Sequence, residues 1–393
     1  MPAQSAIVGI GQTAFSRKIG ISEAAVAYQA IQNAVADAGI SMKDVDGIVR
    51  YSLDTNSEWQ LAYNLGIPQL SYFSVAPGGG NAGSNAVQMA DLAIKGGLAN
   101  YVVVFRARNR GKQSSGGPGQ FEGGRPWEKM SMQVRELGKK FSNPYGLIAA
   151  VQEMAVIARR YMYEYGITYE HFGHVALAER AHAMRNPAAL MREPLTMQDY
   201  LAARWIAEPL RLFDCCLETD GGAAIVVTSV ERAKALKQKP AYILSTGNAN
   251  VFMTVPGTNY YKESLFSTES AAVAKMIYGR AGVGPKDVDA AMIYDAFTPR
   301  VLIGLEDFGF CKRGEAGDFV AAGNMQWPNG AIPTNTSGGS LSEIYLHGFN
   351  LITEAVRQIR GTSTSQVKDA EVVLVASGNF SPTSAFILGS QPS

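Results

Sequence analysis

Cysteine and histidine are the residue types best suited to supply a nucleophile, a base or a metal ligand, and this chain has three cysteines and four histidines. Cys215 and Cys216 precede a turn at residues 219–221, and Cys311 follows an apolar run without a recognisable partner. We expect all three to be structural and to pack in the interior. The small, odd cysteine count also argues against a disulfide framework and indicates a reducing compartment.

The histidines lie in two regions of the chain. His171, His174 and His182 fall in segments of helical periodicity, where His171 and His174 have the i, i+3 spacing of two metal ligands. No further ligands are spaced to complete that site, so we expect no metal. His347 follows a glycine-rich loop, and the sequence leaves open whether it lines a site or forms only local hydrogen bonds.

Glycine is abundant, with 41 residues, and it clusters in loops at residues 77–84 and 334–340. Clustered glycines mark tight turns or places where the backbone approaches another group closely. Each of these loops opens a predicted helix, at residues 84–96 and 342–360. The N-terminus of a helix presents backbone N–H groups that can hold a negatively charged oxygen.

The two glycine-rich loops belong to an internal repeat. Residues 38–51 read AGISMKDVDGIVRY and residues 281–294 read AGVGPKDVDAAMIY, with Ala, Gly, Lys, Asp, Val, Asp and Tyr at identical offsets. An amphipathic helix precedes each copy, and Gly39 and Gly282 have the position of its C-terminal glycine. The density of these matches indicates a duplication.

Each half therefore reads as strand, helix, strand, glycine-rich loop, helix and strand. This alternation predicts an α/β fold with right-handed βαβ crossovers on a mainly parallel sheet, covered by helices on both faces. Residues from about 110 to 210 have no counterpart in the second half. We interpret them as an insertion with helices at residues 149–165 and 169–185 that covers the site.

Size and composition support this organisation. The 393 residues predict two domains or one duplicated unit, and 47% hydrophobic with 18% charged residues is typical of a globular protein with a large core. A net charge of +1 predicts neither nucleic-acid binding nor attachment to an acidic membrane. The first residues lack the basic start of a signal peptide, and no apolar run approaches the roughly 18 residues of a membrane span. We expect a soluble, cytoplasmic protein.

Several segments resemble motifs of the thiolase superfamily. Residues 332–348, IPTNTSGGSLSEIYLHG, resemble N-x-x-G-G-(x5)-H-P-x-G, and residues 294–297, YDAF, resemble N-E-A-F. Residues 209–224, PLRLFDCCLETDGGAA, and residues 192–196, REPLT, resemble the branch of lipid-transfer-protein and sterol-carrier-protein-X thiolases. The resemblance covers nearly the whole chain.

The resemblance implies a thiolase fold, in which two duplicated βαβ-type halves form a five-layered α-β-α-β-α arrangement with an inserted helical loop region. Residues 1–109 and 206–235 would form the N-terminal half, residues 110–205 the insertion, and residues 236–393 the C-terminal half. It also implies a homodimer. We expect the pairing to use residues 101–105, YVVVF, as an edge strand.

The groups that make a thiolase an acyl-transfer enzyme are missing. The position of the nucleophilic cysteine falls on Gly80, that of the catalytic histidine on Tyr345, and that of the asparagine of N-E-A-F on Tyr294. Ser84 lies four residues beyond Gly80 and should point elsewhere. No acyl-enzyme can form at a glycine.

A retro-aldol reaction needs an enolate but no covalent intermediate. A base takes the hydroxyl proton of a β-hydroxyacyl-CoA, the Cα–Cβ bond breaks, and a ketone and an acyl-CoA enolate result. Backbone N–H groups at a helix N-terminus can hold the enolate oxygen. The sequence therefore favours an acyl-CoA carbon–carbon lyase over a thiolase.

We assign Tyr345 as the base and Tyr294 as the hydrogen-bond or proton donor. A free tyrosine titrates near pH 10, so a base at neutral pH needs stabilisation of about 3–4 kcal/mol from a helix N-terminus or a nearby cation. Asp295 fits as a group that orients a neighbour. The further supporting and pocket candidates are His347, Gly80, Gly339, Tyr260 and Tyr261.

These substitutions resemble the steroid side-chain-cleaving aldolases of the lipid-transfer-protein group. That resemblance implies cleavage of a 17-hydroxy steroid CoA thioester to a 17-ketosteroid and propionyl-CoA, without a cofactor, in complex with a hydratase subunit that carries an OB-fold-like domain. Two alternatives stay open: an acyl-CoA acetyltransferase-like thiolase and a non-catalytic lipid-CoA carrier. The candidates for binding the CoA phosphates, unless they form a solvated basic edge, are Arg106, Arg108, Arg110 and Lys112.

Overall fold

The structure, a computed structural model, describes residues 3–77, 80, 83–109, 143–250, 269–378 and 383–392. Within these residues nine strands form one sheet in the order β3-β2-β4-β7-β1-β8-β11-β10-β9. These strands are β1 (Ser5–Gln12), β2 (Gly47–Tyr51), β3 (Tyr72–Ala76), β4 (Tyr101–Arg108), β7 (Gly221–Ser229), β8 (Ala241–Ala249), β9 (Ala290–Ile293), β10 (Val372–Ala376) and β11 (Thr383–Gly389). A separate two-stranded ribbon pairs β5 (Trp205–Ala207) with β6 (Leu210–Arg211).

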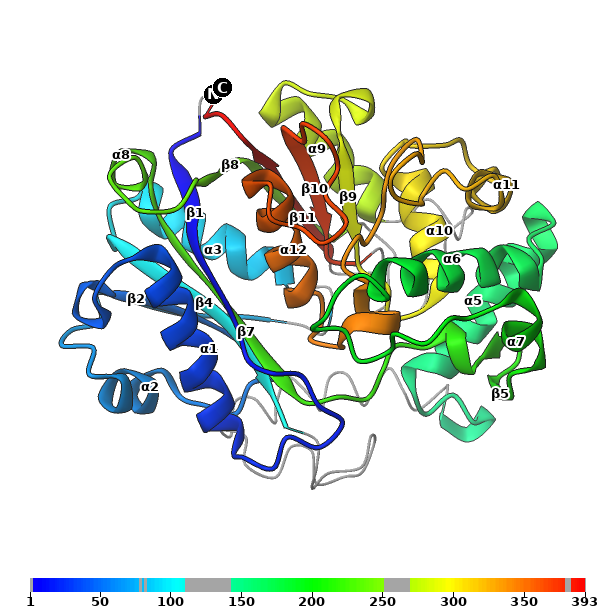
Figure 1. The fold of residues 1–393 in the computed structure, drawn as a ribbon, viewed down its shortest axis with the longest axis horizontal. Helices are drawn as coiled ribbons and strands as arrows, with labels where there is room; N and C mark the ends of the chain where they lie inside the picture. Colours follow the sequence, from blue (N-terminus) through cyan, green and yellow to red (C-terminus); the bar gives the residue numbers. More distant parts are fainter. Residues whose placement is uncertain are drawn as a thin grey trace.

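Helices cover the sheet and form the inserted region (Figure 1). They are α1 (Glu23–Ala38), α2 (Glu58–Leu65), α3 (Gly83–Lys95), α5 (Ala150–Tyr165), α6 (Tyr169–Ala183), α7 (Met197–Ala202), α8 (Val230–Ala233), α9 (Glu269–Ala281), α10 (Thr298–Asp307), α11 (Ala316–Ala321) and α12 (Phe349–Arg360). The two chain ends lie side by side, where the backbone N–H of Ala3 donates to the carbonyl of Pro392 at 2.8 Å.

The repeat is visible in the structure as two copies of one turn. Both α1 and α9 are followed by a left-handed glycine, with φ of 73° at Gly39 and 72° at Gly282. A short 3₁₀ turn comes next in each half. The second aspartate of each KDVD segment accepts a backbone N–H group at the start of the strand that pairs in parallel with the strand after the turn. Asp46 accepts from Tyr101 of β4 at 2.9 Å, and Asp289 accepts from Val372 of β10 at 2.9 Å. The repeated sequence thus forms the same hydrogen bond to a strand in both halves.

The expectation of a mainly parallel sheet is wrong. The pairs β2–β3, β2–β4 and β9–β10 are parallel, but β7 runs antiparallel to β4 and β1, and β11 runs antiparallel to β10 and β8. Each half combines its parallel βαβ strands with antiparallel return strands. The two halves are joined where β1 pairs with β8, through Ala6–Tyr242 and Ile7–Ala241.

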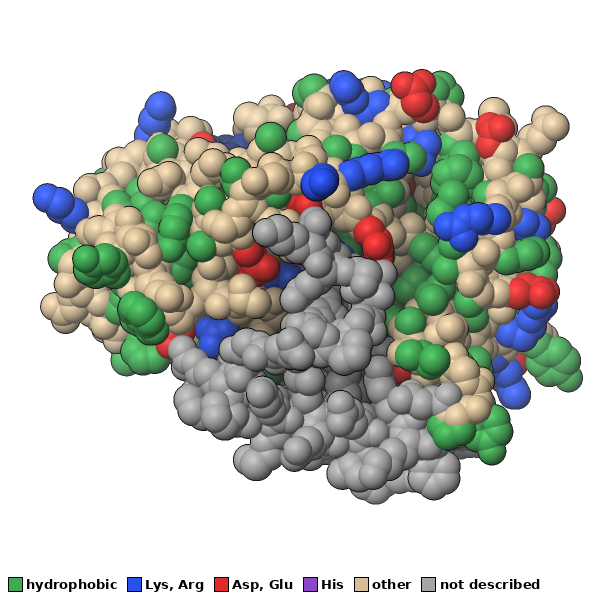
Figure 2. All heavy atoms as spheres, turned by 90° about the horizontal axis from the view of Figure 1, so that it is seen from below, with side chains coloured by type: hydrophobic (Ala, Val, Ile, Leu, Met, Phe, Trp, Pro, Cys, Tyr) green, Lys and Arg blue, Asp and Glu red, His purple; other side chains and the backbone are tan. Residues whose placement is uncertain are grey.

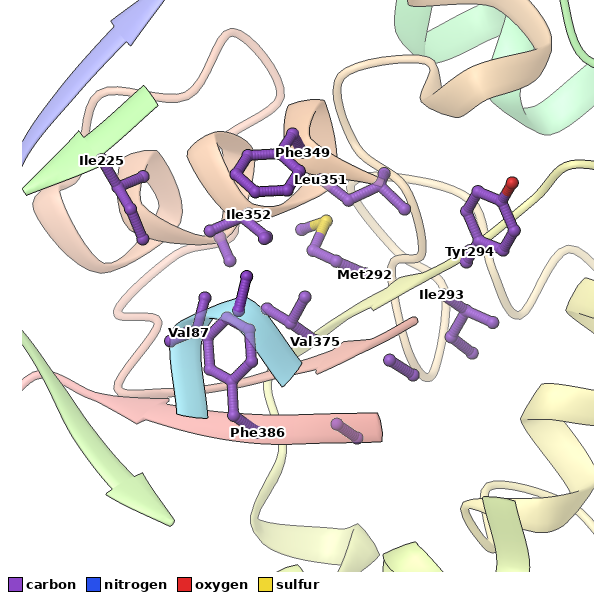
Figure 3. Packing of buried hydrophobic residues seen from close by; sticks show 14 of the residues in the cluster. Val87, Ile225, Met292, Ile293, Tyr294, Phe349, Leu351, Ile352, Val375 and Phe386 are labelled. Carbon is purple, nitrogen blue, oxygen red and sulfur yellow. The ribbon is translucent and has the colours of Figure 1, made fainter. Parts of the chain in front are cut away.

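The helices α3 and α12 lie between the two halves and pack on strands of both. The helix α1 covers the strands β1, β4 and β7, and α9 covers β8 and β11, which completes the five-layered arrangement expected from the resemblance. Figure 3 shows the central contact, with Val87 of α3, Ile352 of α12 and Phe386 of β11 packed together. All three side chains are fully buried. This core fixes the helix starts and strand ends from which the site is built.

The predicted helix at residues 342–360 begins later than expected, at Phe349. A single π-helical turn, Gly339–Glu343, stands in front of it, and a loop connects the two. Left-handed backbone prevents one continuous helix, since φ is 59° at Gly339, 55° at His347 and 85° at Gly348. Tyr345 is therefore placed on a loop rather than on a helix.

Residues 101–105 do not form an edge strand, contrary to the expectation for the dimer. They belong to β4, which extends to Arg108 and pairs with β2 on one side and with β7 on the other. A strand with two neighbours has no free ladder for a second subunit. At this end of the sheet the edge strand is β3, and Phe73 on it is 59% exposed.

The inserted region packs beside the C-terminal half. Its helix α6 contacts α10, α11 and the π turn at Gly339–Glu343, so it supports the loop of Tyr345 as well as extending the fold (Figure 1). No helix in the described residues is long and apolar enough to cross a bilayer. The face in Figure 2 shows acidic, basic and hydrophobic side chains interspersed.

Candidate active site

Two tyrosine side chains from distant parts of the sequence meet at the end of β9. The hydroxyl oxygens of Tyr294 and Tyr345 lie 2.9 Å apart, and the ring centres are 6.4 Å apart with an angle of 25° between the planes. Tyr294 is buried and Tyr345 is half-buried. Figure 3 shows that the Tyr294 hydroxyl points away from the packed core. The structure therefore brings together the two phenols that the motif offsets singled out.

The side chain of Asn335 holds the strand end that carries Tyr294. Its amide imitates a neighbouring strand: Oδ1 accepts from the backbone N–H of Ile293, and Nδ2 donates to the carbonyl of Ile293, both at 2.8 Å. The backbone N–H of Tyr294 donates to the carbonyl of Ala376 at 2.9 Å. Asn335 is fully buried, with φ of 53°. This explains why the first residue of the N-x-x-G-G motif is an asparagine.

A pair of buried carboxyl groups lies under the π turn. Asp295 accepts from the backbone N–H groups of Ser340 and Leu341, and its carboxyl faces that of Glu179 on α6. A side chain at Gly339 would meet Asp295 Oδ2 at 2.2 Å, so glycine is required there. Burial, and then the neighbouring Asp295, raise the pKa of Glu179 well above its ordinary value, and burial also raises the pKa of Asp295. Two buried acidic groups in contact therefore share a proton.

The loop that carries Tyr345 is held from two sides. The backbone N–H of Tyr345 donates to Thr219 Oγ1 at 3.0 Å, and the carbonyl of Tyr345 accepts from Arg108 Nη1 at 3.1 Å. The guanidinium carbon of Arg108 also lies 4.5 Å from the centre of the Tyr345 ring. Arg108 is buried. A fixed cation therefore lies over the face of one of the two phenols.

His347 lies beside Tyr345 in a backbone conformation that histidine seldom adopts. Its φ is 55°, and its ring centre is 4.7 Å from that of Tyr345. Arg106 Nε donates to His347 Nδ1 at 3.4 Å, while Arg106 Nη1 lies 3.4 Å from Asp54 Oδ2. Because a guanidinium only donates, Nδ1 is the acceptor nitrogen, and neutral His347 carries its hydrogen on Nε2.

The space of the missing nucleophile is filled by a tyrosine ring. A Cβ atom added to Gly80 would lie 2.0 Å from both Cζ and Oη of Tyr294. No side chain fits at residue 80 while the ring stays in place. Ser84, as expected, points elsewhere: its hydroxyl lies 2.6 Å from that of Ser377.

Cys215 and Cys311 do not take the place of the nucleophile. Burial raises the pKa of Cys215 far above its ordinary value and that of Cys311 to about 12. A thiol that stays protonated at neutral pH is a poor nucleophile. Cys216 lies close enough to Tyr294 to affect its charge, so it borders the site, a position that the sequence did not indicate.

Electrostatics make the two phenols unequal. Burial, and then the adjacent Tyr345, raise the pKa of Tyr294 well above its ordinary value of 10. Arg300, at the start of α10, interacts with the charges of both tyrosines. Tyr345 is less buried and has Arg108 over its ring. The arrangement can carry a negative charge on Tyr345 and keep Tyr294 as a neutral donor beside it.

The basic residues proposed for CoA phosphates divide into two groups. Arg106 and Arg108 are buried and contact His347 and Tyr345, so neither forms the solvated edge weighed for them. Arg110, Lys112, Tyr260 and Tyr261 lie outside the described residues. Sequence reasoning did not find Glu179, Asp54, Thr219 and Arg300.

One member of the metal pair considered for α6, His171, has other contacts. His171 Nδ1 accepts from the backbone N–H of Thr168 at 3.2 Å, and His171 Nε2 lies 3.6 Å from Asp318. Both ring nitrogens of this residue are thus directed at protein groups.

The fold and site together define a thiolase-fold protein in which paired phenols stand where acyl transfer would need a thiol. A family model described as thiolase C-terminal domain-like matches residues 258–390. A steroid side-chain-cleaving aldolase of Thermomonospora curvata is 44% identical over 99% of this chain and 98% of its own length. A 17-hydroxy-3-oxo-4-pregnene-20-carboxyl-CoA lyase of Mycobacterium tuberculosis is 44% identical over 99% of this chain and 100% of its own.

A solved structure gives the same picture. The Ltp2-ChsH2(DUF35) aldolase superposes with a TM-score of 0.92 at 43% identity, over 99% of this chain and 98% of that one. The chain therefore belongs to the family of steroid side-chain-cleaving aldolases within the thiolase superfamily, and it is a carbon–carbon lyase.

Proposed function

We propose that the protein cleaves a β-hydroxyacyl-CoA by a retro-aldol reaction, with Tyr345 as base and Tyr294 as donor. The observation that carries this proposal is the 2.9 Å contact between the two hydroxyls, with the Tyr294 ring in the space above Gly80. A site filled in this way cannot form an acyl-enzyme at residue 80. It retains two groups that can move a proton.

The substrate class follows from the relatives. One relative is named for a 17-hydroxy steroid whose carboxyl-CoA group is attached at C20. In such a molecule C20 is the α-carbon of the thioester and C17 is the β-carbon that bears the hydroxyl. Breaking the C17–C20 bond leaves a 17-ketosteroid and propionyl-CoA. We propose the same cleavage here, with the CoA thioester as substrate and no cofactor.

Each proton in this reaction has a place. Tyr345, as phenolate, takes the 17-hydroxyl proton, and the electron pair of the C17–C20 bond moves to C20 as the carbonyl forms at C17. The enolate of the thioester then takes the proton at C20 from the tyrosine pair, which returns to its starting state. Tyr294 donates to the Tyr345 oxygen throughout, and Nε2–H of His347 is the candidate donor to the enolate oxygen.

Removing one hydroxyl tests the proposal. Tyr345→Phe should abolish ketone release, since a general base contributes about 10²–10⁴-fold, and should lower stability by only about 1 kcal/mol for one lost hydrogen bond. Tyr278→Phe is the matched control, because its hydroxyl donates to the carbonyl of Phe308 at 3.0 Å, away from the site. The products are measured by mass spectrometry from a panel of β-hydroxyacyl-CoA thioesters, with and without a co-expressed hydratase.

The outcomes separate the candidate functions. Full activity of Tyr345→Phe would refute the assignment of the base. Acylation of the protein by substrate, with inactivation by iodoacetamide, would favour an acetyltransferase-like thiolase. Tight binding of the thioester without any product would favour a carrier.

The assembly is also proposed. The solved aldolase of high similarity carries a second component, ChsH2(DUF35), in its name, which supports a hydratase partner with an OB-fold-like domain. We further propose a cytoplasmic homodimer. Since β4 is interior, pairing falls to an edge strand, and we propose β3, one of the two edges, because Phe73 on it is exposed. Light scattering at micromolar concentration that gives the mass of a monomer would contradict the dimer.

A further inference from the structure

Arg108 occupies a fixed position over the reacting phenol. It is the last residue of β4, where its backbone pairs with Gly221 of β7. The neighbouring N–H of Ala107 donates to Asp54 Oδ2 at 3.0 Å, which ties the strand end to the loop after β2. Arg108 is 3% exposed. The side chain is therefore positioned by the sheet before any substrate arrives.

Two contacts join Arg108 to Tyr345. Its Nη1 donates to the carbonyl oxygen at 3.1 Å, and its guanidinium carbon is 4.5 Å from the ring centre. A cation at this distance attracts the neutral ring weakly and the phenolate far more strongly, because the negative charge of a phenolate spreads over the ring. Burial strengthens that difference. The contact therefore favours the ionised form of Tyr345.

Other groups around Tyr345 work in the same direction or are neutral. The Tyr294 hydroxyl lies 2.9 Å from the Tyr345 hydroxyl and can donate to it when Tyr345 is ionised. Arg300 of α10 adds a second positive charge that interacts with both tyrosines. Further titratable groups near the tyrosine pair, among the described residues, are His347 on the same loop, Arg106 behind His347, Cys216 and Tyr51. Arg108 lies over the Tyr345 ring itself, with its guanidinium carbon 4.5 Å from the ring centre.

We propose that Arg108 is a positioning residue for the cleavage step, which holds Tyr345 in place and stabilises its phenolate. This inference rests on the proposed role of Tyr345 as base. It also gives Arg108 a task inside the site in place of binding a CoA phosphate. The group that Arg108 binds is thus the phenolate of Tyr345 in the same chain.

A spectroscopic titration tests the coupling without substrate. The full-length chain, co-expressed with its hydratase partner, is labelled with [ζ-¹³C]tyrosine, and the Tyr345 resonance is identified by its absence in Tyr345→Phe. In Arg108→Gln the pH midpoint of that resonance should rise by about 1–3 pH units, the effect of an opposite charge within 4–6 Å. Arg108→Lys, which keeps the charge, should restore part of the difference.

Kinetics give the second readout. In Arg108→Gln the acidic limb of the kcat/KM profile should move to higher pH by the same amount, so activity at a fixed pH on that limb falls about tenfold per pH unit. Arg360→Gln is the matched control: the Arg360 side chain is 5% exposed and pairs with Asp37 at 2.7 Å, at the C-terminal end of α12. It removes a buried cation while the Tyr345 midpoint should stay unchanged.

The results test the role of Arg108 separately from the aldolase function. An unchanged Tyr345 midpoint in a folded Arg108→Gln protein would overturn the role of Arg108, whatever its activity. If Arg360→Gln moved the midpoint equally, the effect would be a general loss of charge, and the role would fall too. If the wild-type protein released no ketone while the midpoint moved as expected, the aldolase function would fail and the Arg108–Tyr345 coupling would stand.

Discussion

Replacing Gly80 by alanine adds one methyl group at the point where the site has exchanged a thiol for a phenol. The new Cβ would lie 2.0 Å from Cζ and Oη of Tyr294 and 2.3 Å from Cε1, whereas carbon atoms in contact are about 3.5–4.0 Å apart. The ring must move by roughly 1.5–2 Å to relieve this overlap. Tyr294 is only 3% exposed, so little free space is available for that movement.

The expected cost has two parts. Overpacking a buried site costs about 1–3 kcal/mol, and the displaced hydroxyl also loses its 2.9 Å contact with Tyr345, which is worth about 1 kcal/mol. We therefore expect Gly80→Ala to lower the free energy of unfolding by about 2–4 kcal/mol and to abolish ketone release. Urea unfolding followed by circular dichroism measures the first effect, and mass spectrometry of the products measures the second.

A double-mutant cycle isolates the clash from other effects of alanine. In a Tyr294→Ala background the added methyl group meets empty space, so the cost of Gly80→Ala should fall by about 1–3 kcal/mol. Gly279→Ala is the control, because Gly279 lies exposed on α9 with no atom near its added Cβ, and alanine there should be neutral or slightly stabilising. An equal cost of Gly80→Ala with and without the Tyr294 ring would refute the reasoning.

Two buried ionisable groups predict how stability depends on pH. The pKa of Glu179 is raised above its ordinary 4.5, so the native chain holds a proton that the unfolded chain releases. The free energy of unfolding should therefore fall as pH rises above about 4.5, by up to about 1.4 kcal/mol per pH unit. Glu179→Gln, whose amide can donate to Asp295 in place of the shared proton, should flatten this slope in urea unfolding from pH 5 to 8; an unchanged slope would contradict the shared proton. Burial lowers the pKa of His182 from 6.5 to about 4, so its contribution is present above pH 6.5 and is lost as pH falls towards 4, by up to ~3 kcal/mol. His182→Gln should reduce the acid loss relative to wild type, and calorimetry between pH 4 and 7 that shows equal losses would exclude His182 as the cause.

The parts of the fold that the sequence predicted are those with a local chemical signature. Gly39 and Gly282 end helices because each adopts a left-handed conformation that other residues resist. The offsets within residues 335–345 located Tyr345 relative to Asn335, because the turns between them have a fixed length. Strand direction had no such signature. The apolar pattern of β7 and of β11 is the same for a parallel and for an antiparallel strand. Packing decides that both run antiparallel to their neighbours.

The charged residues of the site were hard to find for a related reason. Glu179 lies in a helical segment rich in polar residues, where a carboxyl reads as solvent-facing, yet it is fully buried against Asp295. Arg106 and Arg108 follow an apolar run and read as a basic strand end, yet β4 carries both into the interior. Each is stabilised by a partner far away in the sequence, and a single sequence does not reveal such partners.

The exchange of a thiol for a phenol is a concerted change in this site. A cysteine restored at residue 80 would place its Cβ inside the ring of Tyr294, and a smaller residue at 294 alone would leave the space beside Gly80 empty. Neither single change yields a competent thiolase site, because the nucleophile and the ring exclude each other. The same backbone thus supports acyl transfer or retro-aldol cleavage, but not both in one molecule. The reaction depends on whether residue 80 or residue 294 places its side chain in the space that they share.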